Sequence, residues 1–121
     1  MTLVPPDPRI LVVDDEPSLR QMLTILLRRE GHQVVAAAGH REALEALRGS
    51  PGPFPVVLTD LAMPDGSGLD VLAAAKSRSA ASQVILITAH STVDNALEAM
   101  KAGAYDFVTK PFEPRELALL V

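Results

Sequence analysis

Four short runs of apolar residues recur along the chain, and each run ends at a polar residue. The runs, with the polar residues that follow them, are residues 10–13 with Asp14 and Asp15, residues 56–59 with Asp60, residues 84–87 with Thr88, and residues 107–109 with Lys110. Apolar runs of this length, separated by helical patterns, are typical of strands buried on both faces of a parallel sheet. Because parallel strands all point the same way, we expect these polar residues to gather at one edge, where open α/β sheets bind ligands.

Segments with the apolar spacing of helices lie between these runs. The first segment begins at Pro17, which suits the first turn of a helix, and ends at Gly31, which suits a left-handed cap. Its inward stripe is predicted to be one helix face wide and to consist of Leu19, Met22, Leu23, Leu26 and Leu27. Three further helices are predicted: one with Ala43, Leu44 and Leu47 that stops near Gly49, one with Leu69 and Leu72, and one with Val93, Ala96, Leu97 and Met100 that closes at Gly103.

The alternation of five predicted strands with helices defines the fold class. It predicts an α/β fold with a doubly wound parallel sheet, right-handed crossovers and helices on both faces. A further short strand is expected at residues 33–37, and a loop at residues 61–67. The first and third strands should be neighbours at the point where the winding reverses, which would bring Asp14, Asp15 and Asp60 together.

The length of the chain indicates a single domain. Its 121 residues are near the commonest domain size, and residues 9–121 are assigned to one domain. Residues 1–8 contain three prolines and are expected to form a disordered leader. A last helix is predicted to open at Glu113, and it is expected to be truncated at Val121.

Composition narrows the environment and the classes of partner. Hydrophobic residues make up 48% of the chain but aromatic residues only 3%, so the core must be aliphatic. The absence of cysteine excludes disulfides and cysteine-based metal or redox chemistry. No apolar stretch approaches the ~20 residues of a membrane span, and the first residues lack the features of a signal peptide, so a cytoplasmic protein without a membrane partner is expected. The net charge of −4 argues against nucleic acid binding by this segment alone.

Each polar residue at a strand end also has a simpler structural explanation. An aspartate just past a strand is often a helix N-cap or a turn residue, and a threonine is common in strands. A lone lysine is usually a solvated surface charge. Only the convergence of five such residues at one sheet edge favours a chemical role.

The three aspartates indicate a magnesium-dependent phosphoryl site. Carboxylates within a few ångströms raise one another's pKa unless a cation compensates their charge. All-oxygen ligands suit a hard ion, and Mg²⁺ typically takes one or two carboxylates together with waters and a phosphate. A carboxylate can also attack a phosphoryl group to form an aspartyl phosphate. Mg²⁺, the Lys110 ammonium and the Thr88 hydroxyl would then each hold one phosphoryl oxygen.

Four motifs in this order resemble the response-regulator receiver domains of two-component signalling. They are Val13-Asp14-Asp15-Glu16-Pro17, the segment from Asp60 to Gly68 (DLAMPDGSG), Thr88-Ala89 and Lys110-Pro111-Phe112. The resemblance covers the chain from Arg9 to Val121. It implies a flavodoxin-like sheet of strand order 2-1-3-4-5. It also implies a phosphorylation-dependent switch that accepts its phosphoryl group from a sensor histidine kinase. Such a domain catalyses only its own phosphorylation and dephosphorylation, so no other enzyme activity is expected.

The resemblance also implies a role for each residue of the acidic cluster. Asp60 corresponds to the phosphoacceptor. Asp15 and Asp60 would bind Mg²⁺ directly, with the backbone carbonyl of Ala62 as the third protein ligand. Asp14 would act mainly through a metal-bound water.

The remaining motif residues are implied to bind the phosphoryl group and to transmit its presence. Lys110 and Thr88 would bind phosphoryl oxygens, and the Lys110-Pro111 bond is expected to be cis. Phe107 lies where the family places its rotating aromatic switch, whereas Tyr105 is expected to be a packing residue. The altered surface would be formed by the fourth helix, the fifth strand and the fifth helix, and it could serve a homodimer.

Two positions that vary in the family and tune the lifetime of the phosphoryl group are Ala62 and His90 here. Alanine cannot position an attacking water, whereas His90 could do so or could equally be an exposed loop imidazole. His32 and His40 flank helices with no partner in view, and no role is assigned to them.

The subfamily that the chain resembles most is the nitrogen-regulation type. This resemblance is carried by Ala89-His90-Ser91-Thr92 and by the segment from Lys101 to Phe107 (KAGAYDF). Regulators of this type usually carry an ATPase and a DNA-binding domain after the receiver. A transcriptional output domain, absent from this chain, is therefore expected to receive the signal.

Two alternative functions remain open. A phosphatase of the haloacid-dehalogenase type also pairs an aspartate nucleophile with Mg²⁺. Its signature, however, places two aspartates two positions apart after the first strand, which Asp14-Asp15-Glu16-Pro17 does not match. A receiver-like interaction module that is never phosphorylated usually lacks one of the five site residues, and this chain lacks none.

Overall fold

The computed structural model describes residues 9–50, 52–88, 100–101 and 103–109. Three helices lie in this part of the chain: α1 (Pro17–Arg29), α2 (His40–Gly49) and α3 (Gly68–Arg78). Five strands form one sheet, and they are β1 (Arg9–Val13), β2 (Gln33–Ala37), β3 (Val56–Asp60), β6 (Gln83–Thr88) and β7 (Asp106–Thr109). The predicted helix that opens at Glu113 lies outside the described residues, as does most of the helix expected before Gly103.

The sheet is parallel throughout its described pairings. Its strand order is β2-β1-β3-β6-β7, so β1 and β3 are neighbours and the winding reverses between them. Val13 pairs with Thr59 across β1 and β3, which brings the next residues, Asp14 and Asp60, side by side. The predicted parallel sheet and the pairing of the first and third strands are therefore confirmed.

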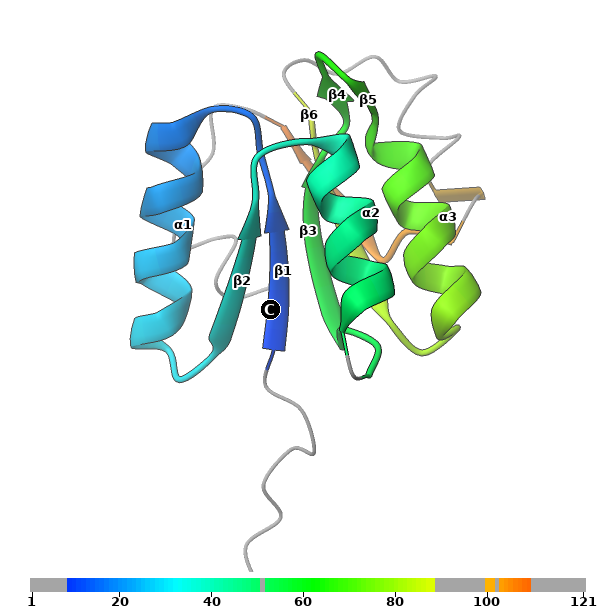
Figure 1. Cartoon of the computed structure of the whole chain (residues 1–121), viewed down its shortest axis with the longest axis horizontal. Helices are drawn as coiled ribbons and strands as arrows, with labels where there is room; N and C mark the ends of the chain where they lie inside the picture. The colour runs from blue at the N-terminus through cyan, green and yellow to red at the C-terminus, as the bar shows by residue number, and fades with distance from the viewer. Residues whose placement is uncertain (1–8, 51, 89–99, 102, 110–121) are drawn as a thin grey trace, which may run out of the picture.

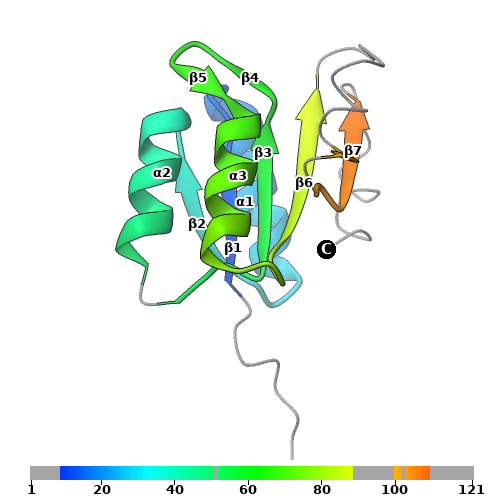
Figure 2. The same ribbon diagram turned by 90° about the vertical axis from the view of Figure 1, so that its right-hand side faces the viewer.

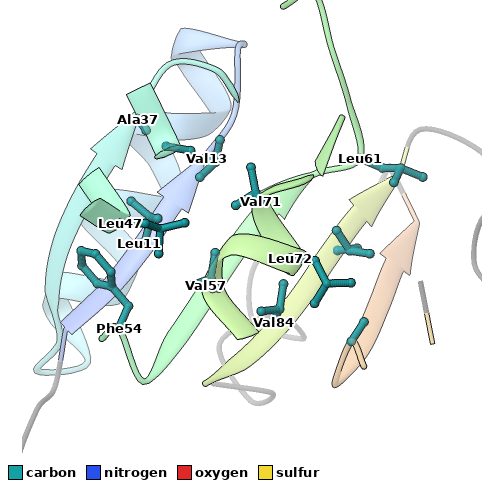
Figure 3. Close-up of a cluster of buried hydrophobic side chains, with 14 of the residues drawn as sticks. Leu11, Val13, Ala37, Leu47, Phe54, Val57, Leu61, Val71, Leu72 and Val84 are labelled. Carbon is teal, nitrogen blue, oxygen red and sulfur yellow. The ribbon is translucent and has the colours of Figure 1, made fainter. Parts of the chain in front are cut away.

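Helices cover both faces of the sheet and create two separate apolar clusters. In Figures 1 and 2, α1 lies on one face while α2 and α3 lie together on the other. Side chains of β1 alternate between the two clusters: Leu11 and Val13 face α2 and α3, whereas Ile10 and Val12 face α1. Figure 3 shows the first of these clusters. Burial on both faces explains why the strands are continuously apolar.

The amino ends of the strands are fixed by the connection that contains Phe54. The Phe54 ring is 2% exposed, and the guanidinium of Arg9 lies 4.9 Å from its centroid. The Ser82 hydroxyl donates to the Phe54 carbonyl at 2.6 Å, and the Gln83 N–H donates to the Pro55 carbonyl at 2.8 Å. These contacts hold the edge of the sheet opposite the predicted site.

Some predicted details of the helices are confirmed and others are wrong. Gly31 has a φ of +94°, as expected for a left-handed cap after α1. Leu23 and Leu27 of the predicted α1 stripe are buried, but Met22 is 39% exposed because it lies at the margin of the packed face. Met100, predicted to face inward, is 42% exposed.

The segment after β3 was expected to be a loop, and the structure shows a hairpin there. Two short antiparallel strands, β4 (Ala62–Met63) and β5 (Gly66–Ser67), pair before α3 begins. In Figures 1 and 2 the hairpin lies beyond the carboxyl ends of the strands, beside α2 and α3. No helix among the described residues has the length and apolar character needed to cross a membrane.

Candidate functional site

The carboxylates of Asp14, Asp15 and Asp60 meet at the carboxyl ends of β1 and β3. Each offers an oxygen, and these oxygens all lie within 4.8 Å of one another. Asp14 is 0% exposed and Asp60 is 5% exposed, whereas Asp15 is open to solvent. The strand pairing expected from the apolar runs thus brings the three predicted residues together.

Three hydrogen bonds, two with backbone groups and one with the Arg20 side chain, position Asp14 at the entrance to α1. Its Oδ1 accepts from the Glu16 N–H at 2.9 Å, and its own N–H donates to the Ala37 carbonyl at 3.2 Å. From α1, the Arg20 guanidinium donates to the Asp14 carbonyl at 2.7 Å. Asp14 therefore also fills the turn role that the simpler structural explanation gave it.

The backbone around Asp60 is fixed by contacts with β6 and α3. The Leu61 N–H donates to the Ile87 carbonyl at 2.8 Å, and the Gly68 N–H donates to the Leu61 carbonyl at 2.7 Å. A Cβ atom at Gly68 would collide with the Asp60 carbonyl oxygen. Glycine is therefore required at the start of α3 for this close approach to the strand end.

Thr88 ends β6 at the same edge of the sheet. It is partly buried, and its neighbour Ile87 pairs with Asp60. Three predicted positions, Lys110, His90 and the side chain of Phe107, lie outside what the structure describes. The expectation that Tyr105 packs is wrong, because its side chain lies at the surface and is 51% exposed.

A second set of polar contacts joins the hairpin and α3 to α2. Asp65, at the turn of the hairpin, accepts from the His40 N–H with Oδ1 at 2.9 Å and from the Arg41 N–H with Oδ2 at 3.1 Å. His40 Nε2 lies 3.0 Å from Asp70 Oδ2 on α3. The N-cap residue of α2 is Gly39, which has no side chain to cap the helix, so Asp65 supplies the cap from a distant part of the chain.

These capping bonds have an electrostatic consequence for Asp65. The N–H groups of Arg41 and His40 stabilise the ionised carboxylate, so they lower the pKa of Asp65 below its ordinary value. Neither the capping role of Asp65 nor the contact of His40 with Asp70 is evident from the sequence. A glycine N-cap without a capping side chain was the signal that could have pointed to a partner elsewhere.

The donor set fits a hard divalent cation. All three side chains are carboxylates, and two of them are buried close together, where their charges repel unless a cation lies between them. Ala62, the predicted third ligand through its carbonyl, begins β4 two residues after Asp60. The residues present are therefore those that Mg²⁺ prefers.

Comparison with known proteins agrees with this geometry. A family model described as the response regulator receiver domain matches residues 10–121. The chain belongs to this family. The relatives include regulators of the nitrogen-regulation type.

The similar proteins are regulators and receiver domains. Response regulator protein PilR of Pseudomonas aeruginosa is 42% identical over 113 residues, which cover 93% of this chain and 25% of PilR. Regulatory protein AtoC of Escherichia coli is 41% identical over 113 residues, which cover 93% of this chain and 24% of AtoC. The receiver domain thus spans about a quarter of these two relatives.

Solved structures show the same fold. A response regulator receiver domain from Clostridium thermocellum superposes with a TM-score of 0.84 at 36% identity, covering 92% of this chain and 88% of that chain. The beryllofluoride-activated NtrC4 receiver domain dimer superposes with a TM-score of 0.83 at 41% identity, covering 93% of this chain and 91% of that chain.

Substitution of Gly68 by alanine tests the close approach at Asp60. The new methyl group must displace the Asp60 carbonyl, so Gly68→Ala should lower the free energy of unfolding by about 1–3 kcal/mol and shift the Asp60 amide signal. Urea unfolding and NMR measure both effects. Gly49→Ala is the matched control, because no atom lies within 4 Å of the added Cβ. A loss of stability as large in the control would contradict the explanation.

The lowered pKa of Asp65 predicts a pH dependence of stability. The folded-state pKa lies below the unfolded value, so the carboxylate stabilises the fold above about pH 4 and loses this effect as the pH falls through the folded-state pKa. The asparagine side chain in Asp65→Asn does not titrate in this pH range. The stability difference between wild type and Asp65→Asn should therefore be largest near neutral pH and shrink in acid. Urea unfolding over a pH series measures it, with Glu45→Gln as the control for charge removal; a difference that grows in acid would contradict the assignment.

Proposed function

We propose that this domain is a phosphorylation-dependent switch in which Asp60 accepts a phosphoryl group from a sensor histidine kinase in the presence of Mg²⁺. The observation that carries the proposal is the convergence of Asp14, Asp15 and Asp60 within 4.8 Å at one sheet edge. Membership of the receiver family supports the signalling role. The domain is not proposed to turn over other substrates.

Each acidic residue at this edge of the sheet is proposed to have a different role in binding Mg²⁺. Asp15, Asp60 and the Ala62 carbonyl would hold Mg²⁺, and Asp14 would act through a metal-bound water. When bound, Mg²⁺ neutralises negative charge on the carboxylates and the phosphoryl group. The fixed backbone on both sides of Asp60 positions its carboxylate for attack, which forms the Asp60 O–P bond as the phosphorus–nitrogen bond to the kinase histidine breaks.

Transmission of the signal is proposed to run from Thr88 to the far surface of the domain. The Thr88 hydroxyl and the Lys110 ammonium would bind phosphoryl oxygens, and Phe107 would turn inward when Thr88 moves. The face formed by the fourth helix, strand β7 and the last helix would then change shape. The NtrC4 receiver is described as a dimer in its beryllofluoride-activated form, which supports homodimerisation as one outcome here. An output domain that controls transcription would receive the signal.

Labelling with a small phosphodonor tests the phosphoacceptor. Acetyl phosphate with Mg²⁺ should add one phosphoryl group to the wild type, and Asp60→Asn should abolish the adduct because the attacking group must be a carboxylate. Intact-mass spectrometry and hydroxylamine sensitivity provide the measurement. Asp70→Asn, at an exposed carboxylate of α3, is the control and should label normally. Labelling that persists in Asp60→Asn would assign the acceptor to another residue.

The coupling role of Thr88 predicts a variant that is phosphorylated but shows no conformational response. Thr88→Ala should still accept phosphate at Asp60, because the nucleophile and the metal ligands remain. It should lose the conformational change at residues 100–109, because the Thr88 hydroxyl that would move toward the phosphoryl group is absent. Backbone NMR shifts with and without beryllofluoride, in wild type and variant, measure this response. Equal responses in the two proteins would remove the coupling role of Thr88.

A further inference from the structure

The segment that contains Ala62 is held at both of its ends. At its base, Leu61 is hydrogen-bonded to Ile87 of β6 and to Gly68 of α3. At its turn, the Asp65 carboxylate accepts from two successive N–H groups at the start of α2. Only three residues, 62–64, lie between these two anchors, so the position of the Ala62 backbone depends on both.

The contact between the hairpin and α2 is close because glycine lies on each side of it. A Cβ atom at Gly39 would lie 2.8 Å from Asp65 Oδ1, which is too short for an unstrained contact. A Cβ atom at Gly66 would collide with the His40 ring, whose side chain is only 20% exposed. Larger residues at either position would therefore displace the Asp65 carboxylate or the His40 ring.

We propose that Asp65 is a positioning residue for the cation site: by capping α2 from the hairpin, it holds the Ala62 carbonyl where the acidic cluster can use it. This inference rests on the proposed function, because it requires Mg²⁺ to bind at Asp15 and Asp60. Asp65 does not touch the ion in this proposal. It acts through the backbone of the hairpin.

The physical basis is the cost of ordering the hairpin. Without the cap, the hairpin samples more backbone conformations, and cation binding must then select the one with the correct carbonyl position. The apparent affinity is then the intrinsic affinity multiplied by the fraction of molecules that already have this conformation. The coupling must also be reciprocal, so bound Mg²⁺ should strengthen the hydrogen bonds from His40 and Arg41 to Asp65 by the same factor.

Removing the negative charge of Asp65 would by itself lower the Mg²⁺ affinity, so the control variant must remove one negative charge from the same region. Asp65 and Glu42 line the same cavity of about 480 Å³ beside Asp15. Glu42→Gln removes one negative charge there but leaves the cap intact. Gly39→Ala does the opposite: it retains every carboxylate while the new Cβ displaces Asp65. The two variants separate the electrostatic effect from the effect of position.

The experiment measures Mg²⁺ affinity by NMR titration in wild type, Asp65→Asn, Gly39→Ala, Glu42→Gln and Asp15→Asn. We expect affinity to fall by about 5-fold or more in Asp65→Asn and in Gly39→Ala, to change less in Glu42→Gln, and to vanish in Asp15→Asn. Amide hydrogen exchange at His40 and Arg41 should slow when Mg²⁺ is added to the wild type. This slowing should exceed that of amides elsewhere in α2, because bound Mg²⁺ stabilises the whole fold and slows their exchange whatever the role of the cap.

Phosphorylation kinetics provide a second measurement. With acetyl phosphate, Asp65→Asn should require more Mg²⁺ for half-maximal labelling but should reach the wild-type rate at saturation, because Asp60 itself is unchanged. Equal Mg²⁺ affinity in wild type and Asp65→Asn, or an equal loss in Glu42→Gln, would overturn the positioning role while leaving the proposed function intact. A wild type that binds no Mg²⁺ and is not labelled at Asp60 would overturn both.

Discussion

The arrangement of this structure depends on one constraint: two adjacent parallel strands hold the buried carboxylates of Asp14 and Asp60 close together, where they repel each other. Asp14 and Asp60 follow residues that pair in register, Val13 and Thr59, so the sheet holds the backbones of these two buried aspartates side by side. Like charges in a medium of low dielectric constant repel strongly, and burial adds a desolvation cost. The apolar clusters on both faces of the sheet offset this cost. A site of this kind favours a ligand that brings positive charge, and a divalent cation is the ligand proposed here.

The two edges of the sheet are built from different interactions. At the amino ends, Phe54 is packed under Arg9 and is joined to Ser82 by a buried hydrogen bond. At the carboxyl ends, backbone hydrogen bonds and close approaches at glycine hold the segments in place, as at Gly68. Backbone groups and glycines position a site without filling it, so the carboxyl edge remains open to a ligand while the amino edge supplies stability.

Much of the fold and the acidic cluster could be predicted from the sequence because their signals are local. The predicted strand at 33–37 agrees with the structure residue by residue, and the apolar runs at 10–13 and 56–59 lie within β1 and β3, since each is a short apolar or β-branched run bounded by turn residues. The convergence of the three aspartates then follows from topology, because the ends of adjacent parallel strands must be neighbours. Family motifs gave the same site by an independent route.

What the sequence could not give is geometry that depends on segments far apart in the chain. Asp65 caps a helix that begins 25 residues earlier, and no local pattern distinguishes such an aspartate from an ordinary turn residue. The β4–β5 hairpin was missed because its strands have only two residues each, too few for any periodicity. Helical spacing assigned Met22 and Met100 to inward stripes, and Tyr105 was expected to pack, but all three are exposed, which is common when a packed face is narrow. Two of the features that the sequence did not predict, the β4–β5 hairpin and the Asp65 cap, lie in the segment after Asp60. Under the proposed positioning role of Asp65, changes of sequence in this segment would adjust the proposed cation site without altering its carboxylates.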